Sequence, residues 1–193
     1  MFPELKKLFT LDPNITFLNH GSYGACPKPI FDKYIQLQKQ LEKEPVRFLG
    51  YDLYPLLENS RDALSRFISC DKDDVVFSPN PSTALNTVIK SLNLKKDDEI
   101  LTTNHEYGAL DRTWHFICKK TGAKYINQTI KLPLNSYDSF IEQFEKGITK
   151  KTKIIFLSHI TSSTALIFPV EKVCKIAKEK NILCIIDGAH APA

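Results

Sequence analysis

Two segments of the chain are apolar along nearly their whole length, and they restrict the fold more than any other feature. They are Lys153–Ser158 (KIIFLS) and Ile182–Ile186 (ILCII), and we expect a helix over Val170–Lys180 between them. Strands this apolar are buried on both faces, as in a parallel sheet covered by helices on each side. The pattern therefore predicts an α/β fold built on a mostly parallel sheet.

The alternation of strands and helices begins near Asp73. Further strands are expected at Val75–Ser78, Glu99–Thr103 and Lys124–Ile130, and helices at Thr83–Leu94, Ala109–Lys120 and Tyr137–Lys146. Gly122 follows the second of these helices, in the position where a left-handed residue ends a helix. Repeated strand–helix–strand units are typical of a doubly wound sheet, so we expect residues 71–193 to form the first part of a large domain.

Residues 1–70 have a different pattern. A loop rich in Gly and Asn (LNHGSYGACPKP) leads into a long polar helix, Ile30–Lys43, which ends before Pro45, and a second helix is expected at Leu53–Ile68. We expect this part to be an N-terminal arm with helices that pack on another body, and not an independent core.

The composition excludes several classes of protein. The 193 residues are 42% hydrophobic and 25% charged, which is typical of a globular chain. The net charge of +4 forms no basic stripe with aromatic residues, so we expect no nucleic-acid partner. The apolar runs are strand-sized and the start has no signal-peptide core, so we expect no membrane contact. An odd number of Cys, five, without a CxxC pair favours a reduced, cytoplasmic location.

Candidate binding residues are sought at the carboxyl ends of the strands, because ligands of open α/β sheets bind there. After Val75–Ser78 come two prolines and then Ser82 and Thr83, which open a helix. Hydroxyl groups, backbone N–H groups and the positive end of the helix dipole favour a phosphate at this place. The alternative is that Ser82 or Thr83 is simply the N-cap, and taken alone the segment favours the cap.

The segment after Glu99–Thr103 places Tyr107 beside Gly108. An aromatic side chain at a strand end, next to a glycine that lets the backbone approach, can stack on a flat ring, and the alternative is an ordinary half-buried tyrosine. The preceding His105 and Glu106 are not half of an HExxH zinc motif, because Ala109 stands where the second His is needed. We expect no metal site.

The two remaining strand ends also carry polar groups. Four hydroxyl residues that include Ser162 follow Lys153–Ser158, and they either bind a polar ligand or make an irregular turn. Asp187 follows the apolar ILCII run, and an ionised group at such a place needs a strong partner. The protonated pyridine nitrogen of pyridoxal 5'-phosphate (PLP) is such a partner, and the alternatives are a helix cap or a pairing with Arg. The four strand ends together describe one ligand.

Six segments in order resemble the class V aminotransferases, most of all their isopenicillin N epimerase-like branch, which are relatives of the cysteine desulfurases. They are FLNHGSYGACP, EPVRFLGYDL, NPSTALNTVI, HEYGALDRTWHF, SHITSSTALIFPV and DGAHAPA, and the similarity runs from about Leu18 to Ala193. The resemblance implies the large domain of fold type I, incomplete at the C-terminus. It also implies a PLP cofactor, a homodimer with active sites near the subunit interface, and an amino-acid-like substrate.

The resemblance also assigns roles to individual residues. It implies that Ser82 and Thr83 bind the PLP phosphate, that Tyr107 stacks on the ring and that Asp187 holds the ring nitrogen. It further implies that His190 contacts the phenolic oxygen and that Ser162 lies where desulfurases have an Asn near the cofactor. The loop at His20 and Gly21 would line the substrate pocket, and Arg47 would bind a substrate carboxylate, or else pair with Glu44 on the surface.

The Schiff-base lysine of the family is expected a short way beyond the DGAH strand, and therefore beyond Ala193, so no catalytic residue is identified. We expect this stretch to be part of a longer enzyme, in preference to a split subunit or a degenerate relative. The function implied is PLP-dependent chemistry at Cα of an amino-acid-like substrate, of epimerase, aminotransferase or lyase type. The alternatives are a cysteine desulfurase-like enzyme and a non-catalytic relative.

Overall fold

The computed structural model describes residues 3–191 and divides the chain into two compact units, Met1–Val76 and Phe77–Ala193. The first unit is helical. Its elements are α1 (Pro3–Lys6), α2 (His20–Tyr23), α3 (Lys28–Lys43), α4 (Pro45–Arg47), a π-helical turn η1 (Phe48–Asp52), α5 (Leu53–Ile68) and a 3-10 turn η2 (Lys72–Asp74). The long helices α3 and α5 confirm the two that the sequence predicted. The roles expected for residues 1–70 and 71–193 stay a prediction.

Local chemistry explains where these two helices begin and end. α3 starts two residues earlier than expected, because Pro29 is favoured in the first turn, where the missing N–H costs nothing. It ends at Lys43, and after the extended Glu44 a new turn begins at Pro45. α5 ends at Ile68, and the next residue, Ser69, caps it: Ser69 has a left-handed backbone (φ 57°) and donates its N–H to the Ser65 carbonyl.

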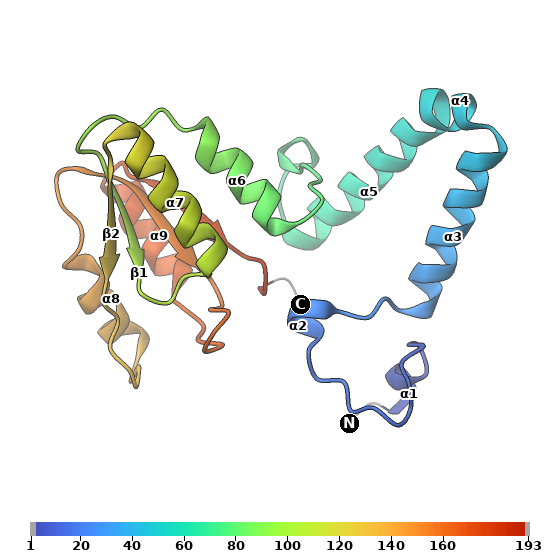
Figure 1. Cartoon of the computed structure of the whole chain (residues 1–193), viewed down its shortest axis with the longest axis horizontal. Coiled ribbons are helices and arrows are strands. Elements are labelled where there is room, and N and C mark those ends of the chain that lie inside the picture. The colour runs from blue at the N-terminus through green and yellow to red at the C-terminus, as the bar shows by residue number, and fades with distance from the viewer. Residues whose placement is uncertain (1–2, 192–193) are drawn as a thin grey trace. The chain divides into compact units, whose positions relative to one another are not determined.

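The second unit is a parallel α/β sheet (Figure 1). Its strands pair in the order β2-β1-β3-β4, every pair parallel, which confirms the predicted architecture. In chain order its elements are α6 (Pro81–Ser91), β1 (Glu99–Thr103), α7 (Gly108–Thr121), β2 (Lys124–Gln128), α8 (Tyr137–Glu145), β3 (Thr152–Ser158), α9 (Val170–Glu179) and β4 (Leu183–Asp187).

Helices cover both faces of the sheet. Successive side chains of a strand point to opposite faces, so one strand contributes to the apolar cluster on each face. On one face, Ile154 and Phe156 of β3 pack in a cluster with Trp114 of α7 and Ile89 of α6. On the other face, Leu157 packs in a second cluster with side chains of α8 and α9, among them Phe140, Phe144 and Val173. These two clusters explain the continuous apolar character of the strands.

The helix α7 ends as its sequence predicts. Gly122 has a left-handed backbone (φ 79°) and donates its N–H to the Cys118 carbonyl over 2.9 Å. A Cβ atom there would also lie 3.3 Å from the Lys96 side chain. Glycine satisfies both demands.

One predicted strand is wrong. Residues 75–78 do not form a ladder: Val75 ends the turn η2, and Val76 and Phe77 are 85% and 49% exposed. A strand needs a neighbour that accepts and donates its backbone hydrogen bonds, and the four-stranded sheet of the described residues pairs neither of its edges with this segment. The β-branched run reflects local preference alone.

The cysteines are free thiols in the structure. The Sγ atoms of Cys174 on α9 and Cys184 on β4 lie 3.7 Å apart, and burial raises the pKa of the Cys184 thiol to about 12. Both groups therefore pack as small apolar side chains. Within residues 3–191, no helix is both long and apolar enough to cross a membrane.

Candidate functional site

The carboxyl ends of the four parallel strands form one edge of the sheet, which we call the carboxyl edge. Helix α7 starts there, because only residues 104–107 separate it from the end of β1. In Figure 1, α6 lies beside α7 and runs in the same direction, opposite to that of β1, so the start of α6 lies toward the same edge. The structure thereby brings six predicted site residues to segments of one edge: Ser82, Thr83, Tyr107, Ser162, Asp187 and His190.

Asp187 is the last residue of β4 and is 7% exposed. Its Oδ1 atom accepts the N–H of Ala189 over 3.0 Å, which is a local turn and not a helix cap. No ion pair within the described part of the chain involves Asp187, so the expected alternative of an Arg partner is not found there. A buried carboxylate with this little compensation calls for a cation.

The start of α6 differs from the alternative that the sequence left open. Asn80, and neither Ser82 nor Thr83, is the N-cap: its Oδ1 accepts the Thr83 N–H over 2.8 Å. Pro81 occupies the first helical position and has no N–H group. The free donors at this helix start are therefore fewer than expected, with the Ser82 N–H remaining among the first three helical positions.

A hollow of about 360 Å³ runs along one face of α6 from its first turn to its last, and its lining residues are Ser82, Thr83, Asn86, Thr87 and Lys90. The Thr87 hydroxyl donates to the Thr83 carbonyl. The Asn86 side chain donates its N–H to the Ser82 carbonyl and accepts the hydroxyl of Thr113 on α7. Two of the polar side chains are thus engaged with the helices themselves. The hydroxyls of Ser82 and Thr83 remain at the start of the helix and suit an anion there. The ammonium group of Lys90 belongs to the last turn of α6, at the other end of the hollow.

Tyr107 stands at the N-cap position of α7, and its side chain is 45% exposed. Its carbonyl accepts the N–H groups of Leu110 and Asp111, which fixes the backbone at the start of the helix. The exposed ring suits stacking on a flat ligand, but an ordinary tyrosine has the same geometry, so its role stays a prediction.

The hydroxyl run after β3 forms a turn. The buried Thr161 organises it: its Oγ1 atom contacts the Thr164 hydroxyl at 2.7 Å and accepts the Leu166 N–H at 2.9 Å. Ser162 is exposed in this turn, and His190 is partly buried in the turn that follows β4. Of the two alternatives for this hydroxyl run, Thr161 and Thr164 fit the irregular turn. Ser162 is exposed to solvent.

The three predicted substrate residues belong to the first unit. His20 opens α2, and its ring packs edge-on against Phe9 and Phe17, with centroids 5.5 and 4.7 Å away. Gly21 lies in the same single turn of helix, where a loop was expected. Arg47 pairs with Asp52 (Nε–Oδ2 3.8 Å) and not with Glu44, so that alternative is wrong. Their relation to the carboxyl edge stays a prediction.

Glu106 is a residue at the carboxyl edge that sequence reasoning missed. Its Oε1 accepts the Thr103 hydroxyl over 2.7 Å, and its Oε2 accepts the N–H and the hydroxyl of Ser158 over 2.9 and 2.7 Å. Burial raises the pKa of the Glu106 carboxyl, the hydrogen bonds oppose this, and the charge of Asp187 raises it further. The available signal was an acidic residue just after a buried strand, the same signal that identified Asp187.

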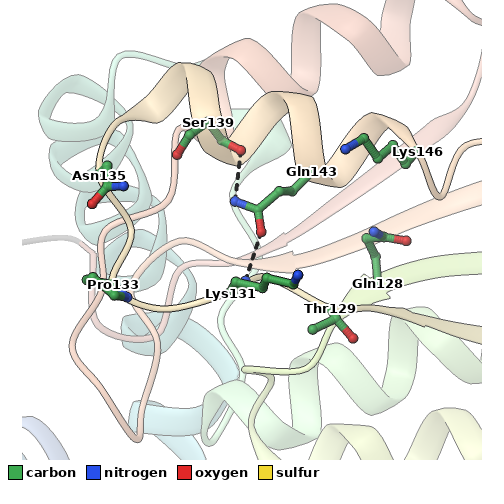
Figure 2. Close-up of a pocket in the computed structure, with 8 residues that line it drawn as sticks. All are labelled: Gln128, Thr129, Lys131, Pro133, Asn135, Ser139, Gln143 and Lys146. Atoms are coloured by element: carbon green, nitrogen blue, oxygen red, sulfur yellow. Dashed lines mark hydrogen bonds between the residues drawn. The ribbon is translucent and has the colours of Figure 1, made fainter.

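A second hollow, of about 420 Å³, lies where β2 ends against α8 (Figure 2). Its lining residues are Gln128, Thr129, Lys131, Pro133, Asn135, Ser139, Gln143 and Lys146. Gln143 fixes the loop to the helix, because its Oε1 accepts the Lys131 N–H over 2.9 Å and its amide donates to the Ser139 carbonyl over 3.0 Å. None of the predicted site residues lines this hollow.

The parallel sheet with helices on both faces has the architecture of the large domain of fold type I. A family model described as "Aminotransferase class-V" matches residues 27–192. The chain therefore belongs to the class-V aminotransferase family.

The chain is similar to isopenicillin N epimerase of Amycolatopsis lactamdurans, with 32% identity over 95% of this chain and 46% of that protein. It is also similar to hercynylcysteine sulfoxide lyase of Schizosaccharomyces pombe, with 29% identity over 97% of this chain and 48% of that protein. A probable cysteine desulfurase of Halalkalibacterium halodurans has 30% identity over 97% of this chain and 49% of that protein. The chain thus spans about half the length of the curated relatives it matches.

Solved structures have the same fold. A variant of C-DES with glycine covalently linked to its PLP cofactor matches with a TM-score of 0.83 at 19% identity, over 99% of this chain and 50% of that one. The apo cysteine desulfurase of Thermococcus onnurineus NA1 matches with a TM-score of 0.79 at 23% identity, over 95% of this chain and 46% of that one. At these identities the likeness establishes the fold alone.

Proposed function

We propose that the chain forms the first part of a PLP-dependent enzyme that acts at Cα of an amino-acid-like substrate. The observation that carries the proposal is the buried carboxylate of Asp187 at the end of β4, which has no cation partner within residues 3–191. A protonated pyridine nitrogen is a cation of the right kind for this place. The family and the PLP-containing structural neighbour support the same cofactor.

The other groups at the carboxyl edge fit the remaining parts of PLP. The hydroxyls of Ser82 and Thr83, the Ser82 N–H and the positive end of α6 would hold the phosphate. The exposed ring of Tyr107 would cover one face of the pyridine ring. His190 and Ser162 follow β4 and β3, and we assign them to the polar substituents of the ring.

Bound PLP supplies an electron sink for negative charge that develops at Cα of an amino substrate. The contribution of Asp187 is to keep a proton on the ring nitrogen, since its carboxylate sits at a poorly solvated strand end and favours the cationic form of a neighbour. The hydroxyls at the start of α6 would anchor the phosphate and so orient the cofactor. Tyr107 excludes water from the ring face that it covers.

The substrate side of the site is the finer part of the proposal. We assign the carboxylate of an amino-acid-like substrate to Arg47, whose side chain is 65% exposed and bound to Asp52 by a long 3.8 Å contact that a substrate can replace. His20 and Gly21 would line the same pocket. A homodimer with its sites near the subunit interface, and a cytoplasmic location, belong to the proposal as well.

For the reaction, we favour an isopenicillin N epimerase-like proton transfer at Cα. Two epimerases are similar to the chain at 32% and 31% identity, and Tyr107 and the SSTAL turn fit that branch. A cysteine desulfurase-like reaction is the second candidate, because a probable desulfurase is 30% identical.

The test is a fluorescence titration of the purified protein with PLP, followed through its single tryptophan, Trp114. Saturable quenching by PLP, with binding at least about tenfold weaker for pyridoxal without its phosphate, is expected. Absence of saturable binding contradicts the proposal. In the full-length enzyme, with the lysine expected beyond Ala193, exchange of the Cα hydrogen of amino acids in D₂O indicates the epimerase-like reaction, and sulfide release from cysteine indicates the desulfurase-like one.

A further inference from the structure

We propose that Glu106 is a positioning residue for the cofactor site: it fixes the end of β3, and through it Asp187, while it also aims the neighbouring Tyr107. The inference rests on the proposed function and assigns to that site a residue that the sequence analysis did not assign to it. It is carried by the contacts of one side chain with two strands.

The Glu106 carboxylate joins the two central strands at their carboxyl ends. One oxygen accepts from Thr103, the last residue of β1, and the other accepts twice from Ser158, the last residue of β3. The backbone register between β1 and β3 runs only from Glu99 to Leu101, so β1 and β3 are not paired at these ends. The side chain of Glu106 supplies the link that the ladder lacks.

The fixed end of β3 determines where Asp187 lies. Ser158 and Asp187 are partners in the β3–β4 ladder, and the His159 N–H donates to the Asp187 carbonyl over 2.9 Å. A shift of the Ser158 backbone would therefore move the Asp187 carboxylate. The two carboxylates are also close enough for the charge of Asp187 to oppose the ionisation of Glu106, which raises the pKa of the Glu106 carboxyl.

The loop that carries Glu106 is held on both sides, and this orients Tyr107. The Asn104 side chain accepts the Ile130 N–H over 2.8 Å, and the His105 ring lies 3.1 Å from the Ile130 carbonyl. The Thr103 hydroxyl also accepts the His105 N–H over 3.2 Å. Three consecutive side chains are thus anchored, and the next residue, Tyr107, leaves the loop in a fixed direction.

Two substitutions separate positioning from charge. In Glu106→Gln, the amide oxygen can still accept both donors of Ser158, and the amide N–H can donate to the Thr103 hydroxyl, so geometry is kept while the charge is lost. In Glu106→Ala, the N–H of Ser158 loses its partner. Val173→Ala, a buried change on α9 outside this cluster, is the control for general destabilisation.

The experiment measures the dissociation constant for PLP by Trp114 fluorescence, the circular dichroism of bound PLP at saturation, and amide hydrogen exchange at Ser158 without PLP. For Glu106→Ala we expect PLP binding about tenfold weaker or more, a changed dichroism and faster exchange. Glu106→Gln should restore all three, and Val173→Ala should change neither PLP signal.

Wild-type PLP affinity and dichroism in Glu106→Ala would overturn the inference, as would equal losses in Val173→Ala. Failure of Glu106→Gln to restore them would also overturn it, because charge would then be the contribution. If the unaltered protein does not bind PLP, the proposed function fails instead. That result is distinguishable, because the variants would still differ in amide exchange at Ser158.

Discussion

Ser158 and Asp187 are partners in the parallel ladder, and each is the last residue of its strand. The Ser158 hydroxyl donates to Glu106, whereas the hydrogen bond of the Asp187 carboxylate within residues 3–191 is the local turn contact from the Ala189 N–H. The two neighbouring strand ends therefore differ: the polar side chain of Ser158 is bound by Glu106, whereas the buried carboxylate of Asp187 remains available to a ligand. This difference underlies the predictions for the site.

In the full-length enzyme, Asp187→Asn should preserve PLP binding and abolish most turnover. The amide has the same shape, but it no longer keeps the ring nitrogen protonated, so a fall in kcat of about 10²–10³-fold is expected. Kinetics and PLP titration of the same preparation measure both quantities. The control is Asp138→Asn, an exposed carboxylate that pairs with Lys172, and it should leave both unchanged. Wild-type turnover with lowered folding stability would make Asp187 a structural residue.

Exchanging Ser82 and Thr83 together for Ala should weaken PLP binding by roughly 3–6 kcal/mol at most, since two hydrogen bonds to a charged group are lost. Asn80→Ala is the matched control, because it removes the helix cap and leaves both hydroxyls. It should cost about 1 kcal/mol of folding free energy with little change in PLP affinity. PLP titration and urea unfolding separate the two effects. Equal PLP affinity in the double variant and the unaltered protein would contradict the phosphate assignment.

Gly147→Ala should destabilise the second unit by about 1–3 kcal/mol. Gly147 is buried, and a Cβ atom there would come within 2.5 Å of Leu101 Cδ1 and 3.0 Å of Gln128 Oε1. Gly108→Ala is the control, since its nearest neighbour is the flexible end of Arg112 at 3.6 Å. Urea unfolding followed through Trp114 gives both values. A smaller loss for Gly147→Ala than for Gly108→Ala would show that the contact relaxes.

The sequence predicted the sheet well because its signals are local. The strands β3 and β4 contribute side chains to the clusters on both faces and are therefore apolar along most of their length, and α5 was predicted with the bounds that it has. The start of α6 was misplaced by two residues because Pro81 was read as loop, although proline is favoured at the first helical position.

What the sequence could not predict depends on partners far along the chain. Residues 75–78 have strand-like side chains, but whether they form a strand depends on a neighbouring strand. Glu106 has its main partner, Ser158, 52 residues away, so no local pattern reveals the contact. That no cationic side chain of residues 3–191 pairs with Asp187 is likewise seen only in the folded chain. Local patterns therefore located the site edge, and only the fold revealed how its acidic residues differ.

The raised pKa of Glu106 makes folding stability depend on pH in a defined direction. The folded protein holds the Glu106 proton more tightly than the unfolded chain, in which the pKa is near its ordinary 4.5. Its contribution is therefore fully present below pH 4.5 and is lost as the pH rises toward the folded pKa. Burial and the charge of Asp187 on β4 raise the pKa of Glu106, and the hydrogen bonds from Thr103 and Ser158 lower it.

Glu106→Gln removes this titration and keeps the hydrogen bonds, so the variant should gain stability relative to the unaltered protein as the pH rises above 4.5. The gain accumulates at no more than about 1.4 kcal/mol per pH unit and becomes constant above the folded pKa. Urea unfolding of both proteins at intervals from pH 4 to 7 measures the difference, in which the titrations that they share cancel. A difference that is flat across this range, or that changes in favour of the unaltered protein, would mean that hydrogen bonds from Thr103 and Ser158 outweigh burial and keep Glu106 ionised like an ordinary surface glutamate.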